Sequence, residues 1–329
     1  MMKKCKLIYF VGLILFVSII GVACSKKGAE PADTKAQITN KPTVQGELSP
    51  TQCAEVTKAP ESEENNSPWK LLSDSTVETS VFYAGFLNES TGVTVGYEGA
   101  ISYTSDGGKT WTPSDIKSAC RYGLSFYDDS FLVTSGNLGV NMTSKDKGKS
   151  WTKLGEFPLK GGGEFNKFLS VIDKKNIYIG APQALGVTKD GGKTWKEIAL
   201  PKQCKKIMGM FFLTSKDGYI LGKDGTLFKT TDSCKTWTTQ TIDLKGEKII
   251  QSPMPAVAIN FQNENDGMIV FGIQSYQLVC LKTSDGGKTW ETVEVPKSYG
   301  LSPYLSRDGK FLTLSALTKQ ISLYKLEDK

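Results

Sequence analysis

The stretch Thr283–Trp290 reads TSDGGKTW, and closely related phrases occur four more times along the chain. The other copies are Thr104–Trp111 (TSDGGKTW), Ser144–Trp151 (SKDKGKSW), Thr188–Trp195 (TKDGGKTW) and Thr230–Trp237 (TTDSCKTW). Their successive aspartates are separated by 40, 44, 42 and 53 residues. A repeat of this period indicates an array of equivalent units, each too small to bury a core of its own.

Each copy, which we call the repeated turn, has the chemistry of a hairpin corner. Its Asp can accept hydrogen bonds from backbone N–H groups a residue or two along, its Gly pair supplies positive φ, and its Ser or Thr hydroxyl can close the turn. The Trp is expected to open the next strand and to pack between layers. We therefore assign a structural role to Asp106, Trp111, Asp146, Trp151, Asp190, Trp195, Asp232, Trp237, Asp285 and Trp290.

The repeated turn resembles the Asp-box, or bacterial neuraminidase repeat, which in known families lies between the third and fourth strands of propeller blades. The resemblance extends from about Trp69 to the C-terminus and implies an all-β propeller of four-stranded antiparallel blades. The form G-x-x-G-x-I, as in Gly96–Ile101, also looks like the propellers of photosystem II assembly and stability factors. That resemblance implies a binding platform, although two arginines are too few for the arginine patch associated with those factors.

The number of blades follows from how the ring closes. Three strand-like runs precede each copy of the turn, and three more follow the last copy at Leu301–Leu305, Lys310–Ser315 and Gln320–Lys325. Trp69–Leu72 looks like the Trp-initiated outer strand that these three lack. One N-terminal strand would then complete the last blade and remove the open edges of the array. We therefore predict six blades, with seven as the alternative.

The N-terminal region reads as a targeting and tethering segment. Three lysines, an apolar run and Gly21-Val22-Ala23-Cys24 resemble a bacterial lipoprotein signal over residues 1–23, with Cys24 as the lipidated residue. The alternative is an uncleaved membrane anchor. Residues 24–67 are polar and predict a flexible tether, and residues 68–329 hold the propeller. Either interpretation places the folded part on the extracytoplasmic side of a cell membrane.

Composition excludes several kinds of chemistry. The chain has no His and only two Arg, Arg121 and Arg307, so we predict neither a His-dependent nucleophile nor an imidazole metal site. The net charge of +6 falls to +3 without the three lysines of residues 1–23, which is too weak to predict nucleic acid binding. The turn phrases lack the upstream Gly of a phosphate-binding loop and the acidic ligands of a calcium loop. We therefore expect no cofactor and no metal.

Sialidases contain Asp-boxes, so glycoside hydrolysis was considered. By resemblance, those enzymes bind the substrate carboxylate with three arginines, which this chain cannot supply. A glycosidase with two carboxylates stays open, with Glu98, Glu164 and Asp224 as its candidates.

A ligand is expected on the face of the ring opposite the repeated turns, where the loops between second and third strands meet the connections between blades. Arg121 and Tyr122 are the preferred anchors, because Arg and Tyr are common in recognition surfaces. We predict a monomeric, non-catalytic platform for a protein or envelope complex, with a glycan-binding protein or glycosidase as the alternative. The candidate residues are Tyr97, Glu98, Arg121, Tyr122, Glu164, Asn166, Gln183, Lys223, Asp224, Gln274, Tyr276 and Tyr304.

Overall fold

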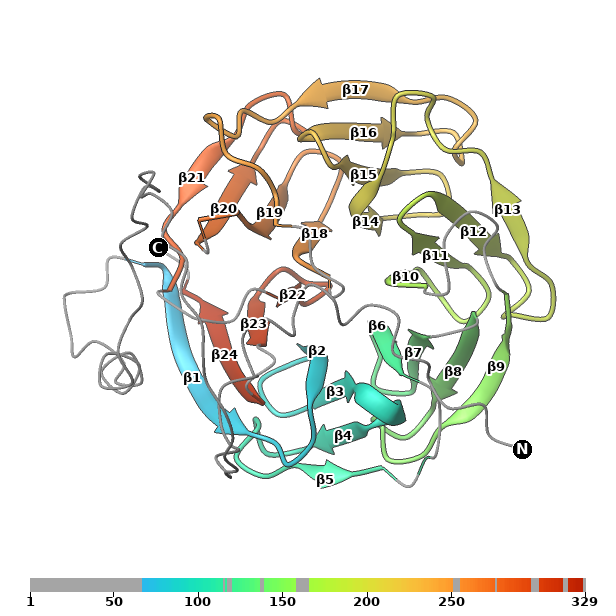
Figure 1. The fold of residues 1–329 in the computed structure, drawn as a ribbon, viewed down its shortest axis with the longest axis vertical. Coiled ribbons are helices and arrows are strands. Elements are labelled where there is room, and N and C mark those ends of the chain that lie inside the picture. The colour runs from blue at the N-terminus through green and yellow to red at the C-terminus, as the bar shows by residue number, and fades with distance from the viewer. Residues whose placement is uncertain are drawn as a thin grey trace, which may run out of the picture. The chain divides into compact units, whose positions relative to one another are not determined.

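The structure is a computed structural model that describes residues 67–114, 116, 120–136, 139–157, 166–250, 255–275, 277–296, 302–315 and 319–327. In these ranges, six four-stranded sheets form a ring around a central channel (Figure 1). The prediction of an all-β propeller with six blades is confirmed, and the alternative of seven blades is wrong. No helix in the described ranges is long and apolar enough to cross a membrane. The predicted signal peptide, Cys24 and the tether up to residue 66 lie outside the described residues.

The blades follow one another along the chain, each starting with its innermost strand. Blade 1 contains β2 (Val81–Phe86), β3 (Gly92–Gly96), β4 (Ile101–Thr104) and β5 (Thr112–Pro113), with the 3-10 turn η2 (Tyr97–Gly99). Blade 2 contains β6 (Arg121–Asp128), β7 (Phe131–Gly136), β8 (Val140–Ser144) and β9 (Thr152–Glu156). Blade 3 contains β10 (Phe168–Val171), β11 (Ile177–Ala181), β12 (Ala184–Thr188) and β13 (Lys196–Ile198).

The second half of the ring repeats this order. Blade 4 contains β14 (Ile207–Phe212), β15 (Gly218–Gly222), β16 (Thr226–Thr230) and β17 (Thr238–Thr241). Blade 5 contains β18 (Val257–Phe261), β19 (Gly267–Gly272), β20 (Leu278–Thr283) and β21 (Glu291–Val293). Blade 6 contains β22 (Ser302–Leu305), β23 (Phe311–Ser315), β24 (Gln320–Leu326) and, outermost, β1 (Trp69–Thr76).

Blade 6 is completed by the two ends of the described chain. β1 pairs with β24 in antiparallel register from Trp69 opposite Leu326 to Thr76 opposite Gln320. The Trp69 side chain is only 2% exposed and packs in the apolar cluster between blades 5 and 6. The predicted closure by an N-terminal strand is therefore confirmed, and the paired strand covers an edge that would otherwise be open to solvent.

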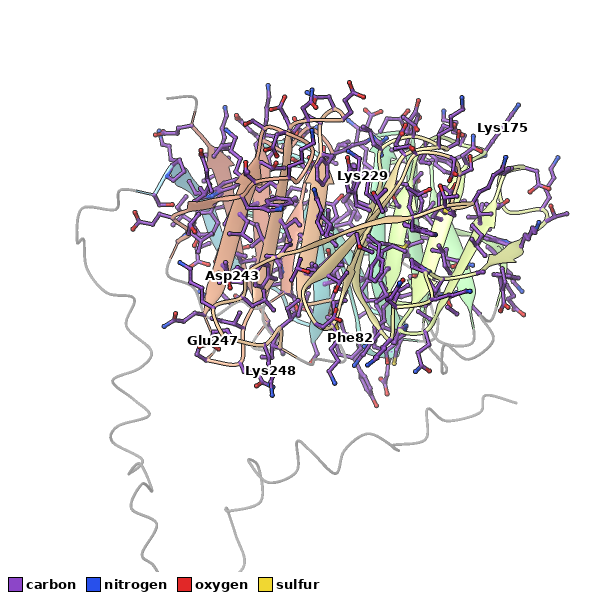
Figure 2. All side chains as sticks on the ribbon, turned by 90° about the horizontal axis from the view of Figure 1, so that it is seen from above. Phe82, Lys175, Lys229, Asp243, Glu247 and Lys248 are labelled. Carbon is purple, nitrogen blue, oxygen red and sulfur yellow. The ribbon has the colours of Figure 1, made fainter. Side chains whose placement is uncertain are left out.

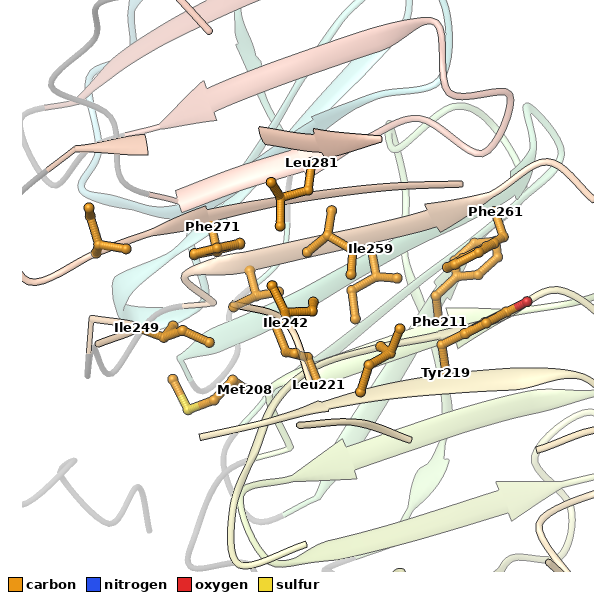
Figure 3. Close-up of a cluster of buried hydrophobic side chains, with 14 residues drawn as sticks. Met208, Phe211, Tyr219, Leu221, Ile242, Ile249, Ile259, Phe261, Phe271 and Leu281 are labelled. Carbon is orange, nitrogen blue, oxygen red and sulfur yellow. The ribbon is translucent and has the colours of Figure 1, made fainter. Parts of the chain in front are cut away.

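Neighbouring blades pack face to face through apolar side chains. Figure 3 shows the cluster between blades 4 and 5, where Met208 and Leu221 from one blade meet Ile259 and Phe271 from the next. Because both faces of these two inner strands are covered, β14 is a continuous apolar run and β18 is apolar except for the buried Asn260. Each fully buried side chain of this size contributes about 1.5–3 kcal/mol.

A repeated glycine makes room for aromatic rings between the blades. Phe212 closes β14 and lies over Gly218, its register partner at the start of β15. A Cβ atom at Gly218 would lie 2.3 Å from the Phe212 ring, so only Gly fits there. Tyr178 of blade 3 then stacks on the other side of Phe212, with ring centroids 3.6 Å apart. The same arrangement recurs one blade later with Phe261, Gly267 and Tyr219.

The repeated turn has the same hydrogen bonds in all five copies. In blade 3, Asp190 accepts from the backbone N–H of Thr194 at 2.9 Å and from the Thr194 hydroxyl, while the Thr188 hydroxyl accepts from the N–H of Gly192. The Asp thus binds the residue four positions along, farther than we expected from the sequence. Cys234 stands at a Gly position with φ of 67°, in the left-handed region. These contacts lie within eight residues and define a structural corner.

Candidate binding face

The topology gives the ring two unlike faces. Hairpins between first and second strands share one end of the ring with the repeated turns, and we call this end the turn face. Loops between second and third strands share the other end with the connections between blades, and we call it the loop face. In Figure 2, Lys175 of a β10–β11 hairpin lies toward the turn face, whereas Phe82, Glu247 and Lys248 lie toward the loop face.

The predicted ligand residues divide into three groups. Glu164 and Tyr276 lie outside the described residues. Exposed side chains on the loop face belong to Tyr97, Glu98, Gln183, Lys223, Asp224 and Gln274. Buried side chains belong to Arg121, Tyr122, Asn166 and Tyr304.

Arg121 is not the exposed anchor that we expected. Its side chain is fully buried, and its Nη1 donates to the carbonyl oxygen of Val140 at 2.7 Å. Burial lowers the pKa of its guanidinium to about 10. Because it spans from the first to the third strand of blade 2, Arg121 is part of the internal structure of that blade.

The side chains of Asn166 and Tyr304 are also buried and make contacts inside the propeller. The Asn166 side-chain amide donates to the carbonyl of Phe157 at 3.1 Å, and the backbone carbonyl of Asn166 accepts from the Ser135 hydroxyl. Tyr304 lies in the inner strand β22, where its ring meets the edges of Tyr83 and Phe126 with centroids 5.7 Å away in each case. We expected Tyr304 on the binding face, but β22 carries its side chain into the wall of the channel, where it is buried.

An aromatic group lies on the loop face at the start of the inner strands of blades 1 and 2. Phe82 stacks on Tyr122 with centroids 5.1 Å apart and an interplanar angle of 12°, and Tyr97 meets Phe82 edge-on at 6.3 Å. Tyr97 is 42% exposed. Phe82 and Tyr122 each occupy a β-bulge, where the register of the inner strand shifts by one residue. A bulge re-aims a side chain, and sequence reasoning missed Phe82 because a bulge is not readable from the alternation of residues.

Three lysines lie at the loop-face ends of blades 3 and 4. Lys167 directly precedes β10, Lys206 directly precedes β14, and Lys223 lies in the β15–β16 loop. Burial and the charge of Lys206 lower the pKa of Lys167 to about 8. The pKa of Lys206 is lowered by burial and by Lys223. Sequence reasoning found Lys223 but missed the other two, since nothing local in the sequence marks a lysine that the fold will half-bury.

The central channel contains a small cavity among the described residues. The cavity between the inner strands has a volume of about 60 Å³, and Lys167 lines it together with Arg307. At the turn-face end, Arg307 crosses the channel and donates to the carbonyl oxygens of Val171 at 2.9 Å and Leu213 at 3.1 Å. The cavity has room for a few water molecules. A larger ligand must therefore bind on a face of the ring.

The two candidate carboxylates that the structure describes, Glu98 and Asp224, do not form a hydrolytic pair. Glu98 lies in η2 of blade 1, and Asp224 lies in the loop of blade 4, on the other side of the six-bladed ring. Asp224 accepts from the backbone N–H of Thr226 at 3.1 Å, which is a turn-stabilising role. Among the described residues, no three His, Cys, Asp or Glu side chains gather to hold a metal ion.

The fold and its repeat define a class: the chain is a six-bladed propeller similar to the YCF48-like, BNR-type propellers. Residues 61–161 match the family model described as photosynthesis system II assembly factor YCF48. Residues 183–299 match the model described as sortilin, neurotensin receptor 3. Each model covers less than half of the chain.

Solved structures support the fold. One described as YCF48 bound to D1 peptide has a TM-score of 0.52 and 16% identity, covering 80% of this chain and 96% of that one. The WD40 repeats of RRP9 have a TM-score of 0.57 and 10% identity, and the match covers 79% of this chain and 97% of that one. Streptogramin B lyase has a TM-score of 0.55 and 10% identity, and the match covers 81% of this chain and 100% of that one. No curated protein sequence matches the chain at a significant level. At these identities, the likeness shows the architecture alone.

Proposed function

We propose that this propeller is a non-catalytic platform that holds a segment of a protein partner on its loop face. The observation that carries the proposal is the aromatic group of Phe82, Tyr97 and Tyr122, which is partly exposed on the loop face. Aromatic side chains supply large contact area at a low entropic cost and are common anchors of protein interfaces. The similar structure of YCF48 bound to D1 peptide supports a protein ligand for a propeller of this architecture.

We also propose that the chain is a monomeric lipoprotein, held at the outer side of a cell membrane by a lipid on Cys24. The support is the sequence of residues 1–24 and the polar segment that follows. Metabolic labelling with a fatty-acid analogue tests this part. We expect the label on the wild-type chain and its loss in Cys24→Ala; a label that survives in Cys24→Ala contradicts the lipid anchor.

The binding face is tested by photo-crosslinking in living cells. A photoreactive phenylalanine analogue replaces Tyr97 in the full-length chain. The matched control replaces Tyr127, which is 37% exposed and lies one residue before the turn-face end of β6. We expect a discrete protein adduct at position 97 that is absent at position 127 and is weakened by Phe82→Ala. Equal adducts at both positions, or none at position 97, contradict the proposed face.

A glycan-binding role is the second candidate, because exposed aromatic rings also stack on sugars. The separation of Glu98 and Asp224 speaks against hydrolysis by this pair, so the candidate reduces to binding. The same crosslinking experiment separates the two functions, since a polysaccharide adduct in place of a protein adduct would favour the glycan.

A further inference from the structure

We propose that a groove between blades 4 and 5, at the turn-face side of the ring, binds a phosphate group, either as the free ion or as part of a small ester. The groove lies between the outer two strands of blade 4 and the repeated turn of blade 5, and it has a volume of about 280 Å³. This inference goes beyond the proposed function, which concerns the loop face. We call this cavity the seam groove, and its lining includes Lys229, Thr231, Thr238, Gln240, Asp285 and Lys288.

The equivalent seam one blade earlier is closed by apolar side chains. Ile198 of blade 3 and Gln240 of blade 4 each pair with the leucine that lies three residues before the repeated turn, so they occupy equivalent positions. Ile198 and Cys234, from the turn of blade 4, pack in one apolar cluster. At the later seam, Gly287 holds the position of Cys234, and a Cβ atom there would lie 3.0 Å from the side-chain oxygen of Gln240. The seam groove is therefore polar where its counterpart is apolar.

Lys229 brings an ammonium group to the wall of the seam groove. Figure 2 shows this residue on the side of the ring where Lys175 lies, which is the turn face. Its Nζ lies 5.4 Å from the centroid of the Tyr219 ring and donates to the carbonyl oxygen of Glu264 at 3.4 Å, which is a long hydrogen bond. A Cβ atom at Gly286 would lie 3.0 Å from the same Nζ, so the ammonium lies close to the turn of blade 5. Because an ammonium has three donors, Lys229 can bind an anion in addition to these contacts.

The tyrosine next to Lys229 has a buried hydroxyl without a partner. In blade 3, the Tyr178 hydroxyl donates to the carbonyl of Ser215 at 3.1 Å. Tyr219 is the equivalent residue of blade 4, and Glu264 is equivalent to Ser215, since each lies three residues after the phenylalanine on which the tyrosine stacks. The Tyr219 hydroxyl makes no hydrogen bond among the described residues, and the Glu264 carbonyl accepts from Lys229. A ligand that draws the ammonium away from Glu264 releases this carbonyl for Tyr219, so binding satisfies a buried donor.

The charges of the seam groove favour an anion. Lys229 and Lys288 reach it from neighbouring blades and supply two positive charges. Asp285 is the carboxylate among the lining residues, and its oxygens already accept from the Thr283 hydroxyl at 2.9 Å and from the N–H and hydroxyl of Thr289 at 2.9 and 2.7 Å. Two ammonium groups therefore face a single carboxylate whose oxygens are occupied within its own turn.

The donors and the size of the seam groove fit a phosphate group. Thr231 and Gln240 add a hydroxyl and a carboxamide, each of which can donate to a ligand oxygen. Lysine binds phosphate as a point charge and does not need the bidentate geometry of arginine. A water molecule takes about 30 Å³ of liquid volume, so the groove has room for phosphate and a small organic group attached to it. Its described lining contains no aromatic ring, and so it lacks a surface on which a neutral sugar could stack.

Calorimetric titration of the full-length protein in detergent solution tests the proposal with glucose 6-phosphate, inorganic phosphate and glucose. We expect glucose 6-phosphate to bind about tenfold more tightly than glucose, and to bind more weakly as salt is added, because the charged groups are partly exposed. Inorganic phosphate identifies the source of the group: binding as tight as that of the ester indicates the free ion, and weaker binding indicates an ester. Equal binding of glucose and glucose 6-phosphate, or no binding of any probe, overturns the proposal.

Substitutions locate the binding. Lys229→Met and Lys288→Met should each weaken the binding of glucose 6-phosphate by about fivefold. The matched controls are Lys282→Met and Lys193→Met, which replace lysines at the same positions of other blades, outside the seam groove, and should bind like the wild type. Gln240→Ile introduces the residue type of the closed seam and should abolish binding, while circular dichroism checks that the variant keeps its fold. Affinity that is unchanged in Lys229→Met and Lys288→Met contradicts the seam groove.

The seam groove and the platform are tested separately, because they lie on opposite faces of the ring. The crosslink at position 97 should form equally in the wild type and in Lys288→Met. If glucose 6-phosphate binds but no crosslink forms at position 97, the proposed function fails and the seam groove stands. If the crosslink forms but no phosphate probe binds, the seam groove fails and the proposed function stands.

Discussion

Arg307 ties the closing blade to the opposite side of the ring. It lies in the β22–β23 hairpin of blade 6, and its guanidinium donates to Val171 and Leu213, which are 136 and 94 residues away in sequence. It also lies over the Phe211 ring, 5.8 Å from the centroid. We therefore predict that Arg307→Met destabilises the whole ring, although this residue belongs to a short surface hairpin.

The expected magnitude follows from the two hydrogen bonds. Bonds from a charged donor contribute about 1.5–3 kcal/mol each, and partial burial of the guanidinium, which lowers its pKa, offsets part of this. Methionine keeps the apolar stem but leaves both carbonyls without this donor, and water in the small cavity can replace some of the loss. We expect a net decrease in unfolding free energy of about 2–3 kcal/mol. For a domain of this size, that decrease lowers Tm by about 4–6 °C.

Thermal and urea unfolding followed by circular dichroism measure this effect. The matched control is Lys310→Met, an exposed lysine in the same hairpin that should unfold like the wild type. The crosslink at position 97 on the loop face serves as a second readout, because Arg307 lies at the turn-face end and its loss should leave that crosslink intact. An Arg307→Met protein with the stability of the Lys310→Met control would refute the cross-channel role.

Three further predictions concern closure, acid stability and thiols. Trp69→Ala should lower the unfolding free energy by about 3–5 kcal/mol in urea titrations, whereas Leu71→Ala, on a side chain that is 51% exposed in the same strand, should change little. The turn hydroxyls and N–H groups hold the pKa of Asp190 at about 2, below its ordinary 3.8. Its stabilising contribution is therefore present above about pH 4 and is lost as the pH falls toward 2. Asp190→Asn should make the unfolding free energy depend less on pH in this window, and an unchanged dependence contradicts the linkage. Burial raises the pKa of Cys234 and Cys280 to about 12, so a thiol reagent at pH 8 should label these cysteines only after unfolding, and rapid labelling of the folded protein contradicts their burial.

The outer strands show where the reading of secondary structure from sequence was less accurate. The run Thr110–Ile116 predicted a full strand, but β5 covers only Thr112–Pro113. Pro113 has no N–H to donate to a ladder, and outer strands are exposed, so apolar pattern and burial give them little definition. The inner strand Val81–Phe86 has the predicted bounds, because burial makes it a continuous apolar run.

The sequence by itself determined the architecture of this protein. Each repeated turn contains nearly all of its own hydrogen-bonding partners within eight residues, so its structure can be inferred without the fold. The five copies and the three further strands after the last one predict six blades. The unpaired strand at Trp69 has one possible place in such a ring, beside β24. The contacts within each turn and the number of strand-like runs were enough to predict the blades and the closing strand.

Only the tertiary structure decided which side chains the loop face presents. Arg121 and Lys167 are both cationic and both lie at the start of an inner strand, yet one is sealed inside its blade by Val140 and the other lines the channel mouth. The difference in burial between Arg121 and Lys167 depends on the β-bulge after Arg121 and on the Val140 carbonyl, which is 19 residues from Arg121 in sequence. It also depends on the close approach of blades 2 and 3. Burial is a sum over such distant contacts, and for that reason no local pattern in the sequence encodes it.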